Sequence, residues 1–122
     1  MKNSISIVEI STSDFSRAVT FYKAILSVSI EEVEMDGTKM GLLPSDGETV
    51  NVLLVKGNDY KPTAEGTVIY FNAGDDLQPT LDKIEPNGGK VIVPKTEISA
   101  EMGFFALIID SEGNKIGLHS IH

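Results

Sequence analysis

The stretch DSEGNKIGLHS, residues 110–120, has the composition of a tight turn followed by a β-strand. Glu112, Gly113 and Asn114 are residues that favour turns, and an alternating apolar pattern follows them. A similar turn, SDGE at residues 45–48, precedes a strand expected at 48–55. Glycines 47 and 113 therefore occupy matching places in two halves of the chain, which indicates an internal duplication.

The first half begins with a strand pattern and an amphipathic helix pattern. Residues 5–11 alternate as a strand does, with Glu9 on the same face as Ile5 and Ile7. Ser13 and Asp14 can cap a helix that follows. The apolar residues of that helix recur at helical spacing: Phe15, Ala18, Val19, Tyr22, Ile25 and Leu26. Short strands are expected after it at 28–34, 38–43 and 48–55.

The second half repeats this order after a polar segment. KGNDYKPTAEG, residues 56–66, is rich in Gly and Pro and is interpreted as a linker. TVIYFNA predicts a strand at 67–73, and DDLQPTLDKIEPNGG predicts a helix that PNGG ends. Further strands are expected at 90–93, 103–110 and 114–120. The whole chain, 1–122, is thus predicted to be one domain of two repeats, about 4–55 and 67–121.

This order of elements predicts an α+β fold. Each βαβββ unit supplies a four-stranded sheet with one helix on one face, and the other face stays bare until the second unit lies opposite it. The two units are expected to form a curved, mostly antiparallel sheet around a cavity, which is a natural ligand site.

Composition narrows the classes of function. The chain has 122 residues, a net charge of −8, 41% hydrophobic residues and no cysteine. It contains no basic stripe for nucleic acid and no apolar run near the ~20 residues that span a bilayer. The start of the chain lacks the apolar block of a signal peptide. We therefore expect a cytoplasmic protein that binds neither nucleic acid nor membrane, and whose acidic field suits a neutral or cationic small molecule.

Three blocks in order resemble the vicinal oxygen chelate superfamily, which includes glyoxalase I, extradiol dioxygenases and bleomycin-resistance proteins. They are VEISTSDFSRAVTFYKAIL at 8–26, YFNAGDDLQPTLDKIEPNGGKVIVPKT at 70–96, and DSEGNKIGLHS at 110–120. The resemblance covers nearly the whole chain and implies the glyoxalase/bleomycin-resistance-like fold. It does not fix the function, because one fold supports many.

Metal-dependent relatives take one His or Glu ligand from each of four strands. The resemblance places those positions at Ile7, Asn51, Val68 and Gly117, and a slip of one residue would put Thr67 in place of Val68. None of these is a good metal ligand, and the two nearby candidates, Glu9 and His119, are too few for a zinc site. No metal and no other cofactor is expected.

Glu9 and His119 lie two residues beyond vacated ligand positions and are the candidate catalytic residues. Glu9 either pairs with Lys115, Lys39 or His119 to close the sheet, or contacts a ligand as a proton acceptor. Other side chains are expected to line the cavity and bind the ligand: Asn51, Tyr70, Asn72 and Gly117. At Gly117 the missing side chain would let a ligand or another side chain approach the sheet.

Four further residues are expected to be structural: Asp14, Arg17, Asp110 and Asn114. Asp14 caps the helix, and Arg17 pairs with Asp14 or another neighbour. The segment KTEISAEMG, 95–103, is either a plain connector or a cover for the cavity mouth.

Three functions remain open from the sequence. The first is metal-independent binding of a small organic molecule, as in bleomycin-resistance-like proteins. The second is a glyoxalase-like lyase or isomerase that uses Glu9 and His119. The third is a dimeric, non-catalytic module whose cavity is filled. The resemblance also implies a homodimer, and the repeats could pair within one chain or exchange between two.

Overall fold

The computed structural model describes residues 4–47 and 49–122. Its elements follow the order expected for two βαβββ units. The first unit contains β1 (Ile7–Ser11), α1 (Phe15–Leu26), β2 (Glu31–Met35), β3 (Thr38–Leu42) and β4 (Asn51–Lys56). The second contains β5 (Tyr70–Asn72), α2 (Gln78–Leu81), the 3₁₀ turn η1 (Glu85–Asn87), β6 (Lys90–Ser99), β7 (Gly103–Ile109) and β8 (Lys115–Ser120).

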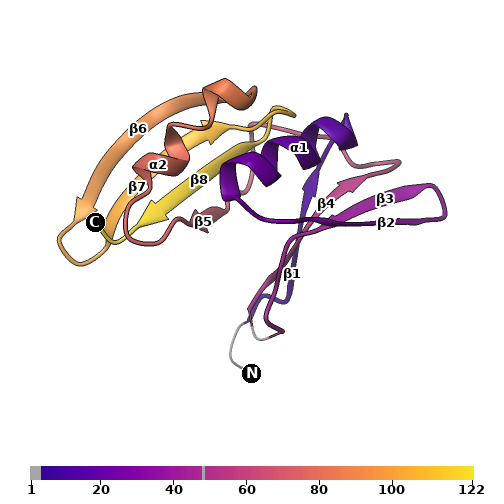
Figure 1. Ribbon diagram of the computed structural model, residues 1–122, viewed down its shortest axis with the longest axis horizontal. Helices are drawn as coiled ribbons and strands as arrows, with labels where there is room; N and C mark the ends of the chain where they lie inside the picture. The colour runs from indigo at the N-terminus through magenta and orange to yellow at the C-terminus, as the bar shows by residue number, and fades with distance from the viewer. Residues whose placement is uncertain (1–3, 48) are drawn as a thin grey trace.

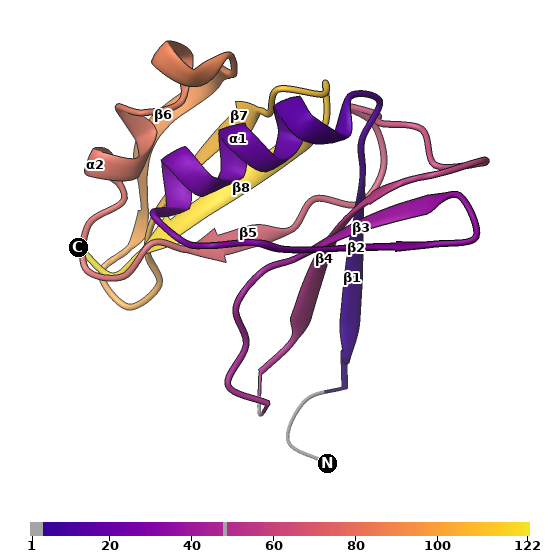
Figure 2. The same ribbon diagram turned by 45° about the vertical axis from the view of Figure 1, so that its right-hand side comes forward.

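The strands form two mixed four-stranded sheets, ordered β1-β4-β3-β2 and β5-β8-β7-β6. In each sheet the first and last strands of the unit are parallel and the remaining pairs are antiparallel. The two sheets diverge from a junction beneath α1, with β1 and β5 as their neighbouring edge strands (Figures 1 and 2). The fold is therefore α+β with two unclosed, curved sheets, as predicted.

Helix α1 crosses from the first unit to the second. The Asp14 carboxylate accepts a hydrogen bond from the Arg17 N–H at 3.1 Å and caps the helix, as expected. The helix then lies over β8, although its sequence belongs to the first half (Figures 1 and 2). Its buried stripe shares one core with both sheets, including Ile10, Leu54, Ala106, Ile108, Ile116 and Leu118. One helix thus supplies the apolar contact that joins the two units.

The second unit departs from the predicted helix and strands in two places. The helix expected over 75–89 is limited to α2 and η1, because Pro79 and Pro86 each lie at the start of a short turn and cannot continue a longer helix. The strand expected at 67–73 is paired only over β5.

The segment 95–103 is not the free loop that the sequence suggested. Most of it continues β6, which pairs with β7 through several register shifts, and the rest is the hairpin turn. Neither alternative, a plain connector or a free loop over the cavity mouth, describes this segment, because strand pairing to β7 holds most of it in the sheet.

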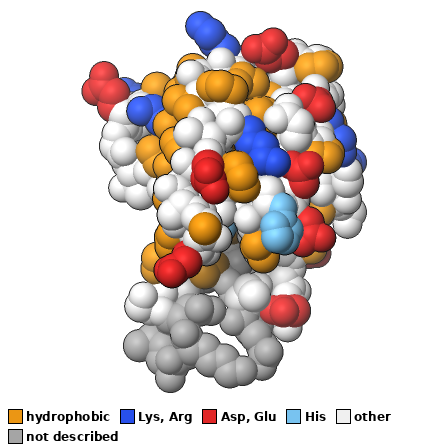
Figure 3. All heavy atoms as spheres, turned by 90° about the vertical axis from the view of Figure 1, so that its left-hand side faces the viewer, with side chains coloured by type: hydrophobic (Ala, Val, Ile, Leu, Met, Phe, Trp, Pro, Cys, Tyr) orange, Lys and Arg blue, Asp and Glu red, His pale blue; other side chains and the backbone are white. Residues whose placement is uncertain are grey.

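Exposed hydrophobic side chains mark the outer faces of both sheets. On the first sheet Ile7, Val33 and Met35 are 58%, 38% and 58% exposed. On the side of β6 and the C-terminus, hydrophobic side chains are interspersed with acidic and basic ones (Figure 3). Within the described residues, no helix combines the length and the hydropathy that a membrane crossing requires.

Candidate functional site

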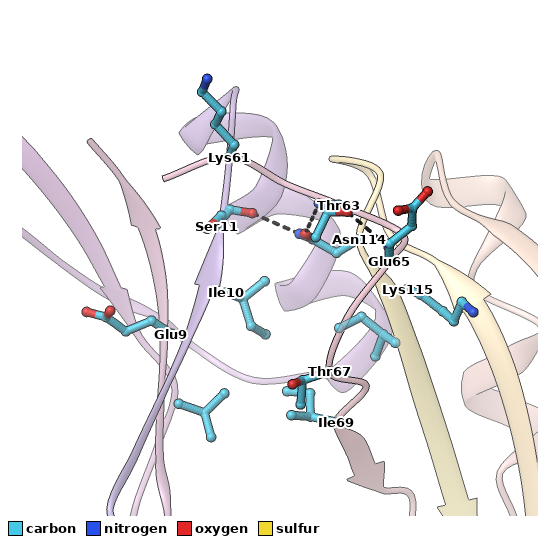
Figure 4. Close-up of a pocket in the computed structure, with 12 residues that line it drawn as sticks. Glu9, Ile10, Ser11, Lys61, Thr63, Glu65, Thr67, Ile69, Asn114 and Lys115 are labelled. Atoms are coloured by element: carbon cyan, nitrogen blue, oxygen red, sulfur yellow. Dashed lines mark hydrogen bonds between the residues drawn. The ribbon is translucent and has the colours of Figure 1, made fainter. Parts of the chain in front are cut away.

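A cleft of about 260 Å³ lies at the junction of the two sheets. One wall is β1, the opposite wall is the start of β8, and the linker between the units passes along the side (Figure 4). Twelve residues line it: Val8, Glu9, Ile10, Ser11, Lys61, Thr63, Glu65, Thr67, Ile69, Asn114, Lys115 and Ile116. The cleft is therefore built from both halves of the chain and from the segment that connects them.

Asn114 ties the three walls together at one end of the cleft. Its Nδ2 donates to the Ser11 carbonyl at 2.8 Å, and its Oδ1 accepts from the Thr63 N–H at 3.0 Å. The Lys115 N–H also donates a hydrogen bond to the Thr63 carbonyl at 3.3 Å. A single amide side chain thus fixes the linker against both units.

Asp110 supports Asn114 from inside the protein. Its carboxylate is 3% exposed and accepts from the Asn114 N–H at 3.0 Å, the Asn114 Nδ2 at 3.1 Å and the Tyr22 hydroxyl at 2.6 Å. Burial and the adjacent negative charge of Asp110 raise the pKa of Tyr22 well above its ordinary value. Tyr22 therefore stays protonated and serves as a donor that links α1 to the turn before β8.

Glu112 holds the beginning of α1 to the same turn. Its carboxylate accepts from the Ser13 and Asp14 N–H groups at 2.9 and 2.7 Å, and from Arg17 Nε at 2.8 Å. Arg17 thus pairs with Glu112, one of the neighbours left open by the sequence. Burial alone would raise the pKa of Glu112, but these hydrogen bonds and one from Ser111 outweigh it and lower the pKa to about 2.

The interior of the cleft is mainly apolar. Ile10 and Ile116, 5% and 3% exposed, form its floor with Val8 and Ile69. The charged ends of Glu9, Lys61, Glu65 and Lys115 point outward, away from this floor (Figure 4). A molecule inside would therefore meet hydrocarbon and a few short polar groups before it met a charge.

Glu9 and His119 have separate hydrogen-bond partners. Glu9 accepts from the Tyr60 hydroxyl at 3.0 Å, rather than from the lysines or the histidine considered from the sequence. His119 Nε2 lies 2.6 Å from the Met102 carbonyl, at the hairpin between β6 and β7. Glu9 lines the cleft and His119 does not. The two candidate catalytic residues are thus each engaged elsewhere.

Gly117 is covered by the ring of Tyr70. A Cβ at Gly117 would overlap carbons of the Tyr70 ring, so a side chain there would have to displace the ring. Tyr70 pairs with Gly117 in register and is 51% exposed, with the Phe105 ring centroid 6.5 Å from its own. The space left by the missing side chain is therefore occupied by another side chain of the same sheet.

The two asparagines predicted to bind ligand lie elsewhere. Asn51 is at the start of β4 and borders a separate hollow of about 380 Å³ beside Leu42 and Pro44. Asn72 accepts the Gly74 N–H at 2.9 Å and stabilises the turn after β5. Of the predicted residues, only Glu9 lines the junction cleft.

Several cleft residues were not predicted as ligand-binding residues. Thr63 lies in the linker, whose breaker-rich composition indicated only a connector, and Ile69 lies in the strand expected at 67–73. Thr67 had been considered only as an alternative position for a metal ligand. Asn114 was assigned to the turn, and its three-way contact was missed. The one available signal was the side-chain amide of Asn114 in the turn and the apolar side chain of Ile69 after the linker.

The positions that hold a metal in metal-dependent relatives do not fit one here. Ile7 and Gly117 offer no side-chain donor, and Gly117 is beneath an aromatic ring. Val68 has no donor either, and the alternative Thr67 and Asn51 supply only neutral oxygen or amide groups. Among residues 4–47 and 49–122, no three His, Asp or Glu side chains gather in a way that could hold a metal ion.

Comparison with known proteins agrees with this architecture. The chain matches the Glyoxalase/Bleomycin resistance protein/Dioxygenase superfamily over residues 4–118. No curated protein sequence matches it.

Solved structures share the fold at low sequence identity. A glyoxalase/bleomycin resistance protein from Albidiferax ferrireducens is 18% identical, with a TM-score of 0.74 over 95% of this chain and 97% of that one. The trypanothione-dependent glyoxalase I of Leishmania major is 15% identical, with a TM-score of 0.72 over 98% and 87%. Glyoxalase I from Zea mays is 15% identical, with a TM-score of 0.70 over 94% of this chain and only 45% of that one. The present chain thus spans less than half of the maize protein.

Proposed function

Because the chain belongs to the Glyoxalase/Bleomycin resistance protein/Dioxygenase superfamily, and because its two units enclose a cleft, we propose that it binds a small organic molecule there without a metal ion. The observation that carries this proposal is the junction cleft itself, which has an apolar floor, a polar rim and walls from both units. Small-molecule sites commonly combine a concave apolar surface with a few polar groups that orient the ligand.

The support for metal-independent binding is the chemistry of the side chains. Ile7, Val68 and Gly117 have no side-chain donor atom, and Glu9 is held by Tyr60. The net charge of −8 disfavours anionic guests over long range, so the ligand class proposed is neutral or cationic.

The test is a fragment-binding screen with two matched tryptophan variants. Thr67 is exposed and lines the cleft, so Thr67→Trp fills the cleft without entering the core. Thr20 is exposed on α1, away from the cleft, so Thr20→Trp is its control. We expect fragments to raise the melting temperature of the parent and of Thr20→Trp, and to lose this effect in Thr67→Trp.

Two results would overturn the proposal. One is a fragment effect that survives in Thr67→Trp, which would place binding outside the cleft. The other is a stoichiometric divalent ion in protein purified without chelators, lost together with ligand binding when the ion is removed.

We also propose a homodimer, because a second chain would cover the bare face of the first sheet. Ile7 on β1 and Val33 and Met35 on β2 lie at opposite edges of the helix-free face of the first sheet and are exposed. Exposed apolar groups on one face of a sheet can mark an interaction surface. We expect light scattering to give the mass of two chains, and Val33→Glu with Met35→Lys to give one. A monomeric parent at micromolar concentration would contradict this.

A further inference from the structure

The polar groups around the junction cleft are largely satisfied by the protein. The Asn114 amide is used at both ends, by Ser11, Asp110 and Thr63. The Ile69 carbonyl accepts the Gly117 N–H at 2.8 Å. The Thr63 hydroxyl accepts the Glu65 N–H at 3.0 Å. These groups already form hydrogen bonds with protein groups instead of water, so they offer a ligand little additional hydrogen bonding.

One hydroxyl group of the cleft remains available. In the described part of the chain, the Thr67 side chain makes no hydrogen bond to protein groups, and it lines the cleft beside the floor of Val8, Ile10, Ile69 and Ile116. Ser11 contributes its carbonyl, which already accepts from Asn114, because its side chain lies with Glu9 on the other face of β1. A hydroxyl can donate or accept, but it supplies no counter-charge.

The charged groups of the rim cannot supply a counter-charge at the floor of the cleft. Lys61 and Lys115 extend away from it, as does Glu65, and the Glu9 carboxylate is turned to the Tyr60 hydroxyl (Figure 4). A charged ligand group seated on the floor would lose water without gaining an ion pair, which is costly. The volume of about 260 Å³ is also below the ~300–1,000 Å³ of sites for drug-sized molecules.

We propose that the ligand of the junction cleft is an uncharged, compact hydrocarbon that carries one hydroxyl or carbonyl group, held by Thr67. This rests on the proposed function and narrows it from neutral or cationic to neutral. The hydrocarbon part covers Ile10 and Ile116, and the single polar group replaces the water lost by the Thr67 hydroxyl.

The experiment compares three probes of equal size and different charge. Cyclohexanol, cyclohexylamine and cyclohexanecarboxylate are neutral, cationic and anionic at pH 7. Methyl signals of Val8, Ile10, Ile69 and Ile116 in NMR titrations report occupation of the cleft. We expect cyclohexanol to shift these signals with an affinity at least about tenfold higher than the amine or the carboxylate, which is the ratio that ~1.4 kcal/mol of unpaired charge gives.

A single variant tests the hydroxyl. Thr67→Val removes it and keeps the shape of the cleft, and methylcyclohexane measures the hydrocarbon contribution. We expect the preference for cyclohexanol over methylcyclohexane to disappear in Thr67→Val, while methylcyclohexane still shifts the same methyl signals.

The outcomes separate the two proposals. If the amine or the carboxylate binds in the cleft as tightly as cyclohexanol, the neutral class is wrong and small-molecule binding stands. The same holds if Thr67→Val keeps the preference for cyclohexanol. If none of the four probes shifts the cleft signals, both this inference and the proposed function are wrong.

Discussion

The turns around Gly47 and Gly113 occupy equivalent positions in the two units but make different contacts in the fold. Both glycines have positive φ, 84° and 99°, and open space beside them. In the first turn the described hydrogen bonds join residues two or three positions apart, as from the Thr49 N–H to Asp46. In the second, Asp110 and Asn114 also reach α1 and β1 of the other unit. The backbone of a turn is thus locally determined, and its side chains decide whether it joins two halves.

The largest effect on stability is expected at Asp110, in the second turn. Asp110→Ala removes a buried acceptor from Tyr22 and Asn114, and leaving such donors unpaired costs about 3–5 kcal/mol of unfolding free energy. Urea unfolding measures it. Asp110→Asn, which keeps one acceptor oxygen, should fall between the parent and the alanine variant. A loss of unfolding free energy below about 1 kcal/mol would mean that Asp110 does not join the second turn to the rest of the fold.

Glu112→Gln tests the charge in the same junction. The amide keeps the shape but loses the carboxylate that Ser13, Asp14 and Arg17 share, and hydrogen bonds to a charged group are worth about 1–3 kcal/mol. Urea unfolding at pH 7 should show a loss of this size.

The pH dependence of Glu112 has a definite sign. Its pKa falls from the ordinary 4.5 to about 2 on folding, so its stabilising effect is complete above pH 4.5 and is lost as the pH falls through 2. The difference in unfolding free energy between the parent and Glu112→Gln should therefore shrink below pH 4.5. A difference that is constant from pH 7 to about pH 2 would show that the carboxylate charge is not what holds α1.

Substituting alanine for each of the two glycines tests the backbone conformation that the turns share. Both positions have positive φ without a clash, so Gly47→Ala and Gly113→Ala should each cost about 1–2 kcal/mol, and by similar amounts. Thermal and urea unfolding of the two variants measure this. A much larger cost at Gly113 would mean that its backbone also depends on the junction.

The smallest effect is expected for Ser45→Ala. The bond from the Gly47 N–H to the Ser45 hydroxyl is local and exposed, so its loss should cost about 1 kcal/mol or less. Comparing its urea midpoint with that of Asp110→Ala gives the direct contrast between the turns. Equal losses would show that the two turns contribute alike to the fold.

Much of the fold followed from short-range patterns. The spacing of Phe15, Ala18, Val19 and Tyr22 predicted the helix, and Asp14 its cap, because both depend on residues within a turn or two. The second helix was predicted too long, since its apolar row of Leu77, Leu81 and Ile84 extends beyond Leu81, where α2 ends, and Pro86 begins a separate 3₁₀ turn.

The site was less predictable. The sequence predicted that Tyr70 and Gly117 both line the cavity, but the ring that covers the glycine follows from their pairing in register across two strands. The preference of Glu9 for Tyr60 was also hidden, because residues 56–66 had no pattern that showed where the linker runs.

By itself the sequence determined the duplicated order of elements, the amphipathic helix and the two glycine turns, because periodicity and turn chemistry act between near neighbours. Only the tertiary structure decided which sheet α1 covers and what Glu112 and Asn114 hold. The bond from Arg17 to Glu112 joins residues 95 positions apart, and such a bond exists only after the apolar faces of both units have packed together.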